Sequence, residues 1–160
     1  MSAAALLASV GYAAAAATTS VAFAVLRNAP RRTLWVCALA GLAAWAASAP
    51  IQYLGETAPV FLGGAAVTAV AEVAAARLRV PVLTVLAPGI LPLTPGLLAY
   101  HSILGLATGG YDVAVRDGIL ALFWAGSLAA GIAAVGLVAR ALRGRRPAAP
   151  TETGVSADRP

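Results

Sequence analysis

The sequence has very little charge. Only 11% of its 160 residues are Asp, Glu, Lys or Arg, whereas 61% are hydrophobic, and a soluble domain carries about 25% charged residues. No lysine is present, so the formal net charge of +5 comes from arginine alone. We therefore expect an integral membrane protein. At about 20 residues for each spanning helix, the chain has room for four or five spans and for no separate soluble domain.

Residues that carry out chemistry are also scarce. The chain has one histidine, one cysteine and six acidic residues, and these show no metal-ligand spacing, no nucleophile beside a base and no phosphate-binding loop. We therefore expect no enzymatic activity, no metal and no cofactor. The single cysteine, Cys37, lies within an apolar run. An intramolecular disulfide is thus excluded, and packing in the core is the expected role.

The apolar runs predict an all-α fold of five transmembrane helices. The expected spans are residues 4–26, 33–49, 58–76, 81–107 and 118–139, which together form a transmembrane domain at 1–140. The chain begins with small and apolar residues like a signal peptide, but it lacks a basic n-region, so we interpret this stretch as a retained first helix. Residues 141–160 are basic and then rich in Pro, Ala and Thr, and we expect a disordered cytoplasmic tail.

The distribution of arginine predicts the orientation. The arginines stand in short clusters between apolar runs, as the positive-inside rule requires, which argues against a nucleic-acid partner. With five spans, an outside N-terminus and an inside C-terminus, ten of the eleven arginines lie inside and only Arg116 lies outside. A four-span alternative, with 81–107 as a re-entrant hairpin, would export the basic cluster at 140–146 and is disfavoured. The expected location is the inner (plasma) membrane.

Proline interrupts the fourth run. Pro81, Pro88, Pro92 and Pro95 fall within fifteen residues, and each removes a backbone donor and clashes with a preceding carbonyl. The run predicts a discontinuous span, because its helical length of about 40 Å exceeds a hydrocarbon core of about 30 Å and leaves residues free to unwind. Lipid cannot satisfy the backbone groups released at such a break. We therefore expect a partner chain or a homo-oligomer to cover it.

Polar residues gather beside this break. Thr94 and Tyr100 offer hydrogen bonds, and the freed amides near Gly96 favour anions. Discontinuous helices of this kind bind substrate in many secondary transporters, although a proline kink without a ligand is the alternative interpretation. His101 follows at once, and histidine titrates near neutral pH, which suits proton coupling; a structural hydrogen bond between helices is the other candidate role.

Glu72 is the one acidic residue placed inside a span. A carboxylate in a membrane is costly and by default suggests function, here a proton or cation site. Pairing with Arg77 or Arg79 at the interface is the competing hypothesis. Small residues predict close helix packing at two places. They are Gly63, Gly64, Val67 and Thr68 in the third span, and Gly126, Ala130 and Gly131 in the fifth.

The segment LPLTPGLLAY, residues 91–100, resembles the signature of the threonine/serine exporter family, in particular that of its C-terminal half. The signature is an apolar residue, Pro, an apolar residue, any residue, Pro-Gly and a later Tyr. Pro92, Leu93, Pro95, Gly96 and Tyr100 match it in place. The preceding ARLRVPVLTVLAPGI is similar to the lead-in of the same half. In length and span order the resemblance extends over nearly the whole hydrophobic region.

The resemblance implies a secondary exporter of small polar metabolites. Some members are one chain of two five-span halves, and others are split into a large and a small subunit, the split type including succinate exporters. This chain is similar to the small subunit alone, so the implied partner is a larger subunit that supplies the N-terminal half. Threonine/serine-like amino acids and small dicarboxylates both remain candidate substrates. A non-transporting subunit that stabilises or assembles a partner is the alternative function.

Overall fold

The structure is a computed structural model that describes residues 3–55 and 57–144. Every regular element in this part of the chain is helical, which confirms the expected all-α fold. The α-helices are α1 (Ala3–Leu26), α2 (Leu34–Ser48), α3 (Thr57–Leu78), α4 (Leu83–Ile90), α5 (Gly96–Thr108) and α6 (Tyr111–Gly144), and the 3₁₀ turns are η1 (Arg31–Thr33), η2 (Ala49–Leu54) and η3 (Leu91–Leu93).

Four helical stretches in the described residues are long and apolar enough to cross a membrane. They are Leu7–Leu26, Arg31–Ile51, Thr57–Leu78 and Tyr111–Leu142. A fifth candidate consists of Leu83–Leu93 and Gly96–Thr108, which are bent by 55° at the break between them. The expected Pro/Gly-broken fourth helix is therefore present, and the protein has four or five candidate membrane spans.

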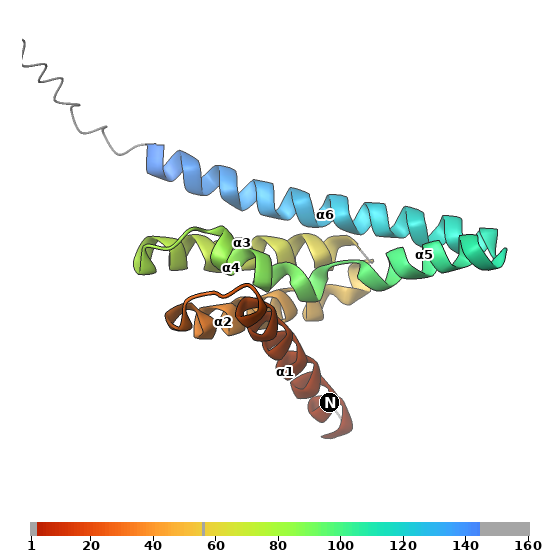
Figure 1. Ribbon diagram of the computed structural model, residues 1–160, viewed down its shortest axis with the longest axis horizontal. Coiled ribbons are helices and arrows are strands. Elements are labelled where there is room, and N and C mark those ends of the chain that lie inside the picture. The colour runs from red at the N-terminus through yellow and green to blue at the C-terminus, as the bar shows by residue number, and fades with distance from the viewer. Residues whose placement is uncertain (1–2, 56, 145–160) are drawn as a thin grey trace, which may run out of the picture.

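The helices pack through small residues. In Figure 1, α2, α3 and α4 form the centre of the bundle, α1 lies against α2, and α6 lies along α3. A Cβ atom at Gly41 of α2 would meet the Ala16 carbonyl of α1, and one at Gly131 of α6 would meet the Phe61 carbonyl of α3. Such close backbone approach is typical of membrane helices, which gain packing contacts where side chains are absent.

Two expectations about individual residues hold in this core. The predicted small-residue face of α3 is buried, since Gly63, Gly64, Val67 and Thr68 all lie in the interior. Cys37 is a free, completely buried thiol in the main hydrophobic cluster. The three small residues predicted to pack in α6 differ from one another. Gly131 is buried against α3, whereas Gly126 and Ala130 are exposed and Gly126 has no atom near its would-be Cβ.

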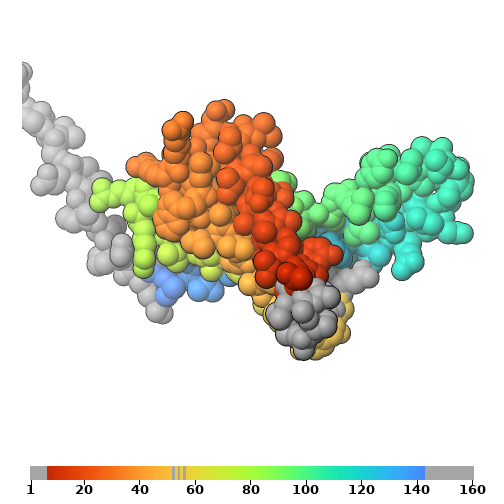
Figure 2. All heavy atoms as spheres, turned by 90° about the horizontal axis from the view of Figure 1, so that it is seen from below, coloured from red at the N-terminus to blue at the C-terminus, as the bar shows by residue number. Residues whose placement is uncertain are grey.

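The helix α5 and the N-terminal part of α6 project from the bundle as a hairpin, which we call the arm (residues 96–118). Figures 1 and 2 show the arm extending beyond the other helices. Gly109 adopts φ +82°, a conformation that glycine enters without steric cost, and it ends α5 so that the chain can reverse. Only Gly105 of α5 is buried, so most of the apolar surface of this helix is exposed.

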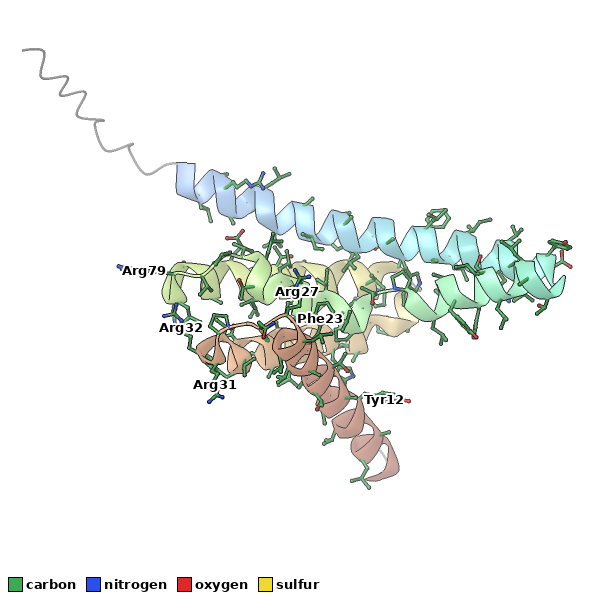
Figure 3. All side chains as sticks on the ribbon, in the orientation of Figure 1. Tyr12, Phe23, Arg27, Arg31, Arg32 and Arg79 are labelled. Atoms are coloured by element: carbon green, nitrogen blue, oxygen red, sulfur yellow. The ribbon has the colours of Figure 1, made fainter. Side chains whose placement is uncertain are left out.

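The basic connections lie at one end of the bundle. Figure 3 places Arg31, Arg32 and Arg79 at the same end, and Figure 1 shows α6 finishing there as well. Asn28 and Arg79 have positive φ values of 54° and 52° and follow the ends of α1 and α3, where such residues terminate helices. This grouping agrees with the clusters on which the predicted orientation rests, and the orientation itself stays a prediction.

The last helix is longer than the expected span of 118–139. It begins at Tyr111 and continues to Gly144, so the segment interpreted as an outer loop is largely helical. Contacts with α5 explain the difference: the Ser102 hydroxyl donates to the Ala114 carbonyl at 2.8 Å, and the Ala114 Cβ lies beside Gly105. Asp112 in the first turn also suits the positive end of the helix dipole. The predicted tail from residue 145 onward lies outside the described residues.

Candidate functional site

The helix break lies at Thr94 and Pro95. Thr94 is extended, with φ −70° and ψ 137°, because the ring of the following proline disfavours helical geometry in the residue before it. Pro95 has φ −79° and ψ 41° and precedes the first turn of α5. Pro88 lies inside α4 and Pro92 inside η3, so the predicted cluster of prolines coincides with the change of direction.

The backbone at the break is only partly satisfied by the chain itself. The Leu91 carbonyl accepts hydrogen bonds from the Thr94 hydroxyl at 2.7 Å and from the Thr94 amide at 3.2 Å. The N-terminus of α5 has no side-chain cap, although the first amides of a helix have no partner within it. The break therefore offers backbone donors at Gly96 and beyond to a molecule outside this helix.

Most of the predicted substrate residues face outward. Thr94 and Gly96 are exposed, Pro95 is half-buried, and the Tyr100 side chain is 59% exposed. No neighbour lies within 4 Å of a Cβ built at Gly96. These four residues are thus available, wholly or in part, to a partner chain, to lipid or to a ligand.

A cavity lies on the inner side of the break. Its volume is about 330 Å³, which is at the lower end of the range for small-molecule sites, about 300–1,000 Å³. The end of α2, the start of α3, η3 and the middle of α6 enclose it. Among the lining residues are Ser48, Val60, Pro92, Leu93 and Trp124. Pro92 is the only predicted substrate residue that lines this cavity.

Trp124 is a candidate site residue that our interpretation of the sequence missed. Its indole Nε1 atom is buried and has no hydrogen-bond partner among the described residues. The fifth apolar run, residues 118–139, contains no other side-chain N–H group. A single polar N–H in an apolar span was the only indication of a function that the sequence offered, and no recognisable motif surrounds Trp124.

A second cavity lies toward the basic end of the same helices. It measures about 570 Å³ between α3, α4 and α6, and it is lined by Thr68, Glu72, Leu86, Gly136 and Arg140 among others. The structure therefore places Glu72, which is half-buried, together with a guanidinium of α6. Arg77 is exposed one turn further along α3 and lines a different surface depression.

Close packing separates the two cavities. A Cβ at Gly63 would lie 2.7 Å from the Leu93 side chain, and a Cβ at Gly64 would lie 2.9 Å from that of Leu128. These contacts occupy the part of α3 and α6 that lies between the linings of the two cavities. The contacts of Leu93 and Leu128 with the glycines of α3 therefore form the layer between the two cavities.

His101 pairs with α6. Its Nδ1 atom lies 3.8 Å from the Asp117 Oδ2 atom, with the histidine side chain about half exposed and the aspartate mostly buried. The Tyr100 ring lies beside the imidazole, with 5.9 Å between the ring centroids. Asp117 is thus the acidic residue that contacts the single histidine of the chain.

Comparison with known proteins identifies the family to which the chain belongs. A family model described as "Threonine/Serine exporter, ThrE" matches residues 12–138, a range that contains the break, the cavity beside it, the lining of the second cavity apart from Arg140, and most of the helical bundle. Neither a curated protein nor a solved structure matches the chain. The range covers most of the sequence, and the multi-span helical fold is that of a membrane protein. The chain belongs to the threonine/serine exporter family.

Proposed function

We propose that the chain is the small subunit of a two-component secondary exporter of small polar metabolites. Its substrates are threonine/serine-like amino acids or small dicarboxylates. The observation that supports this proposal best is a coincidence: within a chain of the exporter family, the 55° helix break borders a cavity of metabolite size. Discontinuous helices of secondary transporters bind substrate in the same way.

The mechanism that we propose is alternating access around the break, from Pro88 to His101. One cavity borders the break and the other lies toward the basic end, and the contacts of Leu93 and Leu128 with the glycines of α3 lie between them. Unpaired amides at the start of α5 offer hydrogen bonds to the part of the substrate that lies at the break. Pro92, Thr94, Pro95, Gly96 and Tyr100 shape this site.

Two titratable groups are candidates for ion coupling. His101 contacts Asp117 across the arm, and Glu72 lines the cavity at the basic end. Each residue lies beside one cavity or the break, so a change in its protonation would reach the substrate path. Both assignments follow from position and chemistry, and variants at each residue test them separately.

A larger subunit completes the site. The uncapped start of α5, the exposed Tyr100 and the apolar surface of the arm would otherwise face lipid, which offers no hydrogen bonds to free amides. A second membrane-embedded polypeptide, or a second copy of this chain, covers that surface. With the positive-inside rule applied to the basic end, the assembly lies in the inner (plasma) membrane with the N-terminus of this chain outside and its C-terminus inside.

Efflux from cells that express the larger subunit, with and without this chain, tests the proposal. Cells preloaded with labelled threonine, serine or succinate should export at least one of them only when both chains are present. Export by the larger subunit alone would refute the transport role of this chain. Membrane content of the larger subunit must be measured in parallel, so that a loss of efflux is not mistaken for a loss of protein.

The exposure of the outer break residues favours a second candidate function. Thr94, Gly96 and Tyr100 could serve as an interface that stabilises or assembles a partner membrane protein, without contact with substrate. In that case the partner alone would keep its transport rate per molecule, and removal of this chain would lower only its abundance. The same paired measurement of efflux and abundance distinguishes the two functions.

A further inference from the structure

We propose that the Trp124 indole N–H is the donor that holds a carboxylate of the transported metabolite in the cavity beside the break. The inference rests on the function proposed above and deepens it. It assigns the carboxylate, which amino acids and dicarboxylates share, to a residue of α6 that lies outside the broken helix.

The first observation is an unsatisfied donor in a place where donors are costly. Trp124 Nε1 is buried, and no acceptor of the described residues bonds to it. An orphaned buried donor destabilises the fold, because it loses its hydrogen bond to water and gains none in return. Indole has a single polar atom, and phenylalanine would fill much of the same space without that cost. The N–H is therefore available to an acceptor beyond the described residues, and we assign that acceptor to the substrate.

The second observation is the place of Trp124 in the fold. The residue lines the 330 Å³ cavity together with Ser48, Pro92 and Leu93. The Ser48 hydroxyl already donates to the Trp45 carbonyl at 3.1 Å. The four side chains of the lining that come from α3 and η3 are apolar: Pro59, Val60, Pro92 and Leu93. Among these residues the indole N–H is the side-chain donor without an acceptor. The atom is covered in this conformation, so it reaches an anionic group in the cavity when the indole ring turns toward it.

The third observation concerns Leu93, which belongs to the layer of side chains between the two cavities. Leu93 lines the cavity and also fills the space at Gly63. A carboxylate held by Trp124 would thus lie against the same side chain that separates this cavity from the second one. Substrate binding and the packing of η3 on α3 share one residue, which gives the bound carboxylate a direct influence on opening.

The test compares two tryptophan variants in the full chain, expressed with the larger subunit. Trp124→Phe keeps an aromatic ring and removes the N–H, whereas Trp45→Phe removes an indole of α2 that does not line this cavity. Trp124→Phe should raise the KM for threonine, serine or succinate by roughly 10- to 100-fold, the loss expected for a hydrogen bond to a charged group. Trp45→Phe should leave KM within about twofold.

Stability separates a ligand-binding role from a structural one. In Trp124→Phe the removal of an unsatisfied donor offsets the smaller packing of the new ring, so unfolding should change little while KM rises. An unchanged KM with measurable efflux overturns the inference and leaves the proposed function in place. A loss of stability that accounts for the whole loss of efflux also overturns it.

A binding measurement tests whether Trp124 binds a carboxylate, without the need for a transport assay. With Trp35→Phe and Trp45→Phe, Trp124 is the only tryptophan of the chain, and its fluorescence in lipid nanodiscs reports directly on the cavity. Threonine or succinate should shift or quench this emission, and threonine methyl ester, which lacks the free carboxylate, should not. If no efflux is detected but the carboxylates act on Trp124, the proposed transport function falls, and only the assignment of Trp124 as a carboxylate-binding residue stands. No response, or an equal response to the ester, refutes it.

Discussion

Replacement of Gly131 by alanine should weaken the contact between α3 and α6. A Cβ at this position would meet the Phe61 carbonyl oxygen and would lie 3.1 Å from the Ala65 amide nitrogen and 3.1 Å from the Phe61 carbonyl carbon. All three atoms belong to the backbone of α3, so no rotation of a side chain can relieve the clash. The two helices must therefore separate, and the packing on both sides of the contact must follow.

The magnitude follows from two opposing effects. Overpacking in a tightly packed interior costs about 1–3 kcal/mol, and alanine in place of glycine stabilises a helix interior by about 0.5–1 kcal/mol. Gly131→Ala should therefore lose about 1–2 kcal/mol of unfolding free energy. Gly126→Ala provides the matched control, because Gly126 lies in the same helix, is exposed, and has nothing within 4 Å of its would-be Cβ.

Unfolding of the purified protein in mixed micelles, titrated with denaturing detergent and followed by circular dichroism, measures the difference. The two variants should differ by roughly 2 kcal/mol, with Gly126→Ala at or above the unsubstituted protein. Equal stabilities, or a more stable Gly131→Ala, would refute the close approach of α6 to α3. That result would also remove the basis for two cavities separated by packing along these helices.

Three further predictions concern other parts of the molecule. Gly41→Ala should lower the free energy of unfolding by about 1–3 kcal/mol because its Cβ would meet the Ala16 carbonyl, whereas Gly11→Ala, with open space at the Cβ, should not lower it. Thermal unfolding of both variants measures the difference, and equal losses would count against the packing of α1 on α2. Asp117→Asn should change the free energy of unfolding by less than about 1 kcal/mol, as the loss of a partly exposed ion pair does. If His101 is the coupling group, the same variant should reduce the response of efflux to an imposed pH gradient, with Asp112→Asn as the control. An unaltered response would exclude the His101–Asp117 pair from coupling. Reporter fusions after Arg79 should be cytoplasmic and fusions after Tyr53 and Gly109 external, since Arg79 lies at the basic end; a cytoplasmic reporter after Gly109 would refute the five-span orientation.

The long apolar runs allowed the spans to be predicted closely. The first three expected spans, 4–26, 33–49 and 58–76, agree with α1, α2 and α3 to within a few residues, because apolar length and flanking arginine determine where a membrane helix begins and ends. The prolines predicted the broken fourth helix for an equally local reason. Each one limits its own backbone and that of the preceding residue.

The start of α6 could not be predicted in this way. Asp112, Arg116 and Asp117 make the segment polar, which is typical of a loop. In the structure the segment is helical because it packs on α5 through Ser102 and Gly105. That pairing depends on the reversal at Gly109, so it involves residues on both sides of the turn and is not visible in either stretch alone.

The candidate site was predicted in part. Local chemistry pointed to the break, and the break does border a cavity, but Thr94 and Tyr100 point to its outer side. Which side of a broken helix faces the bundle depends on the direction of the bend, and that direction is set by contacts such as Leu93 with Gly63. Trp124 enters the site only through the packing of α6 beside η3, which leaves no local pattern in the sequence.

The central claim, that the break forms the working part of an exporter, is tested most directly by Pro95→Ala combined with Gly96→Ala. The double variant lets α5 extend backward toward η3 and removes the extended geometry that Pro95 imposes on Thr94. Efflux of labelled threonine, serine and succinate should be measured in cells that carry the larger subunit, with Pro81→Ala as the control outside the break. We predict loss of efflux at normal membrane abundance for the double variant and retained efflux for the control. Unchanged efflux of every substrate by the double variant would contradict the account.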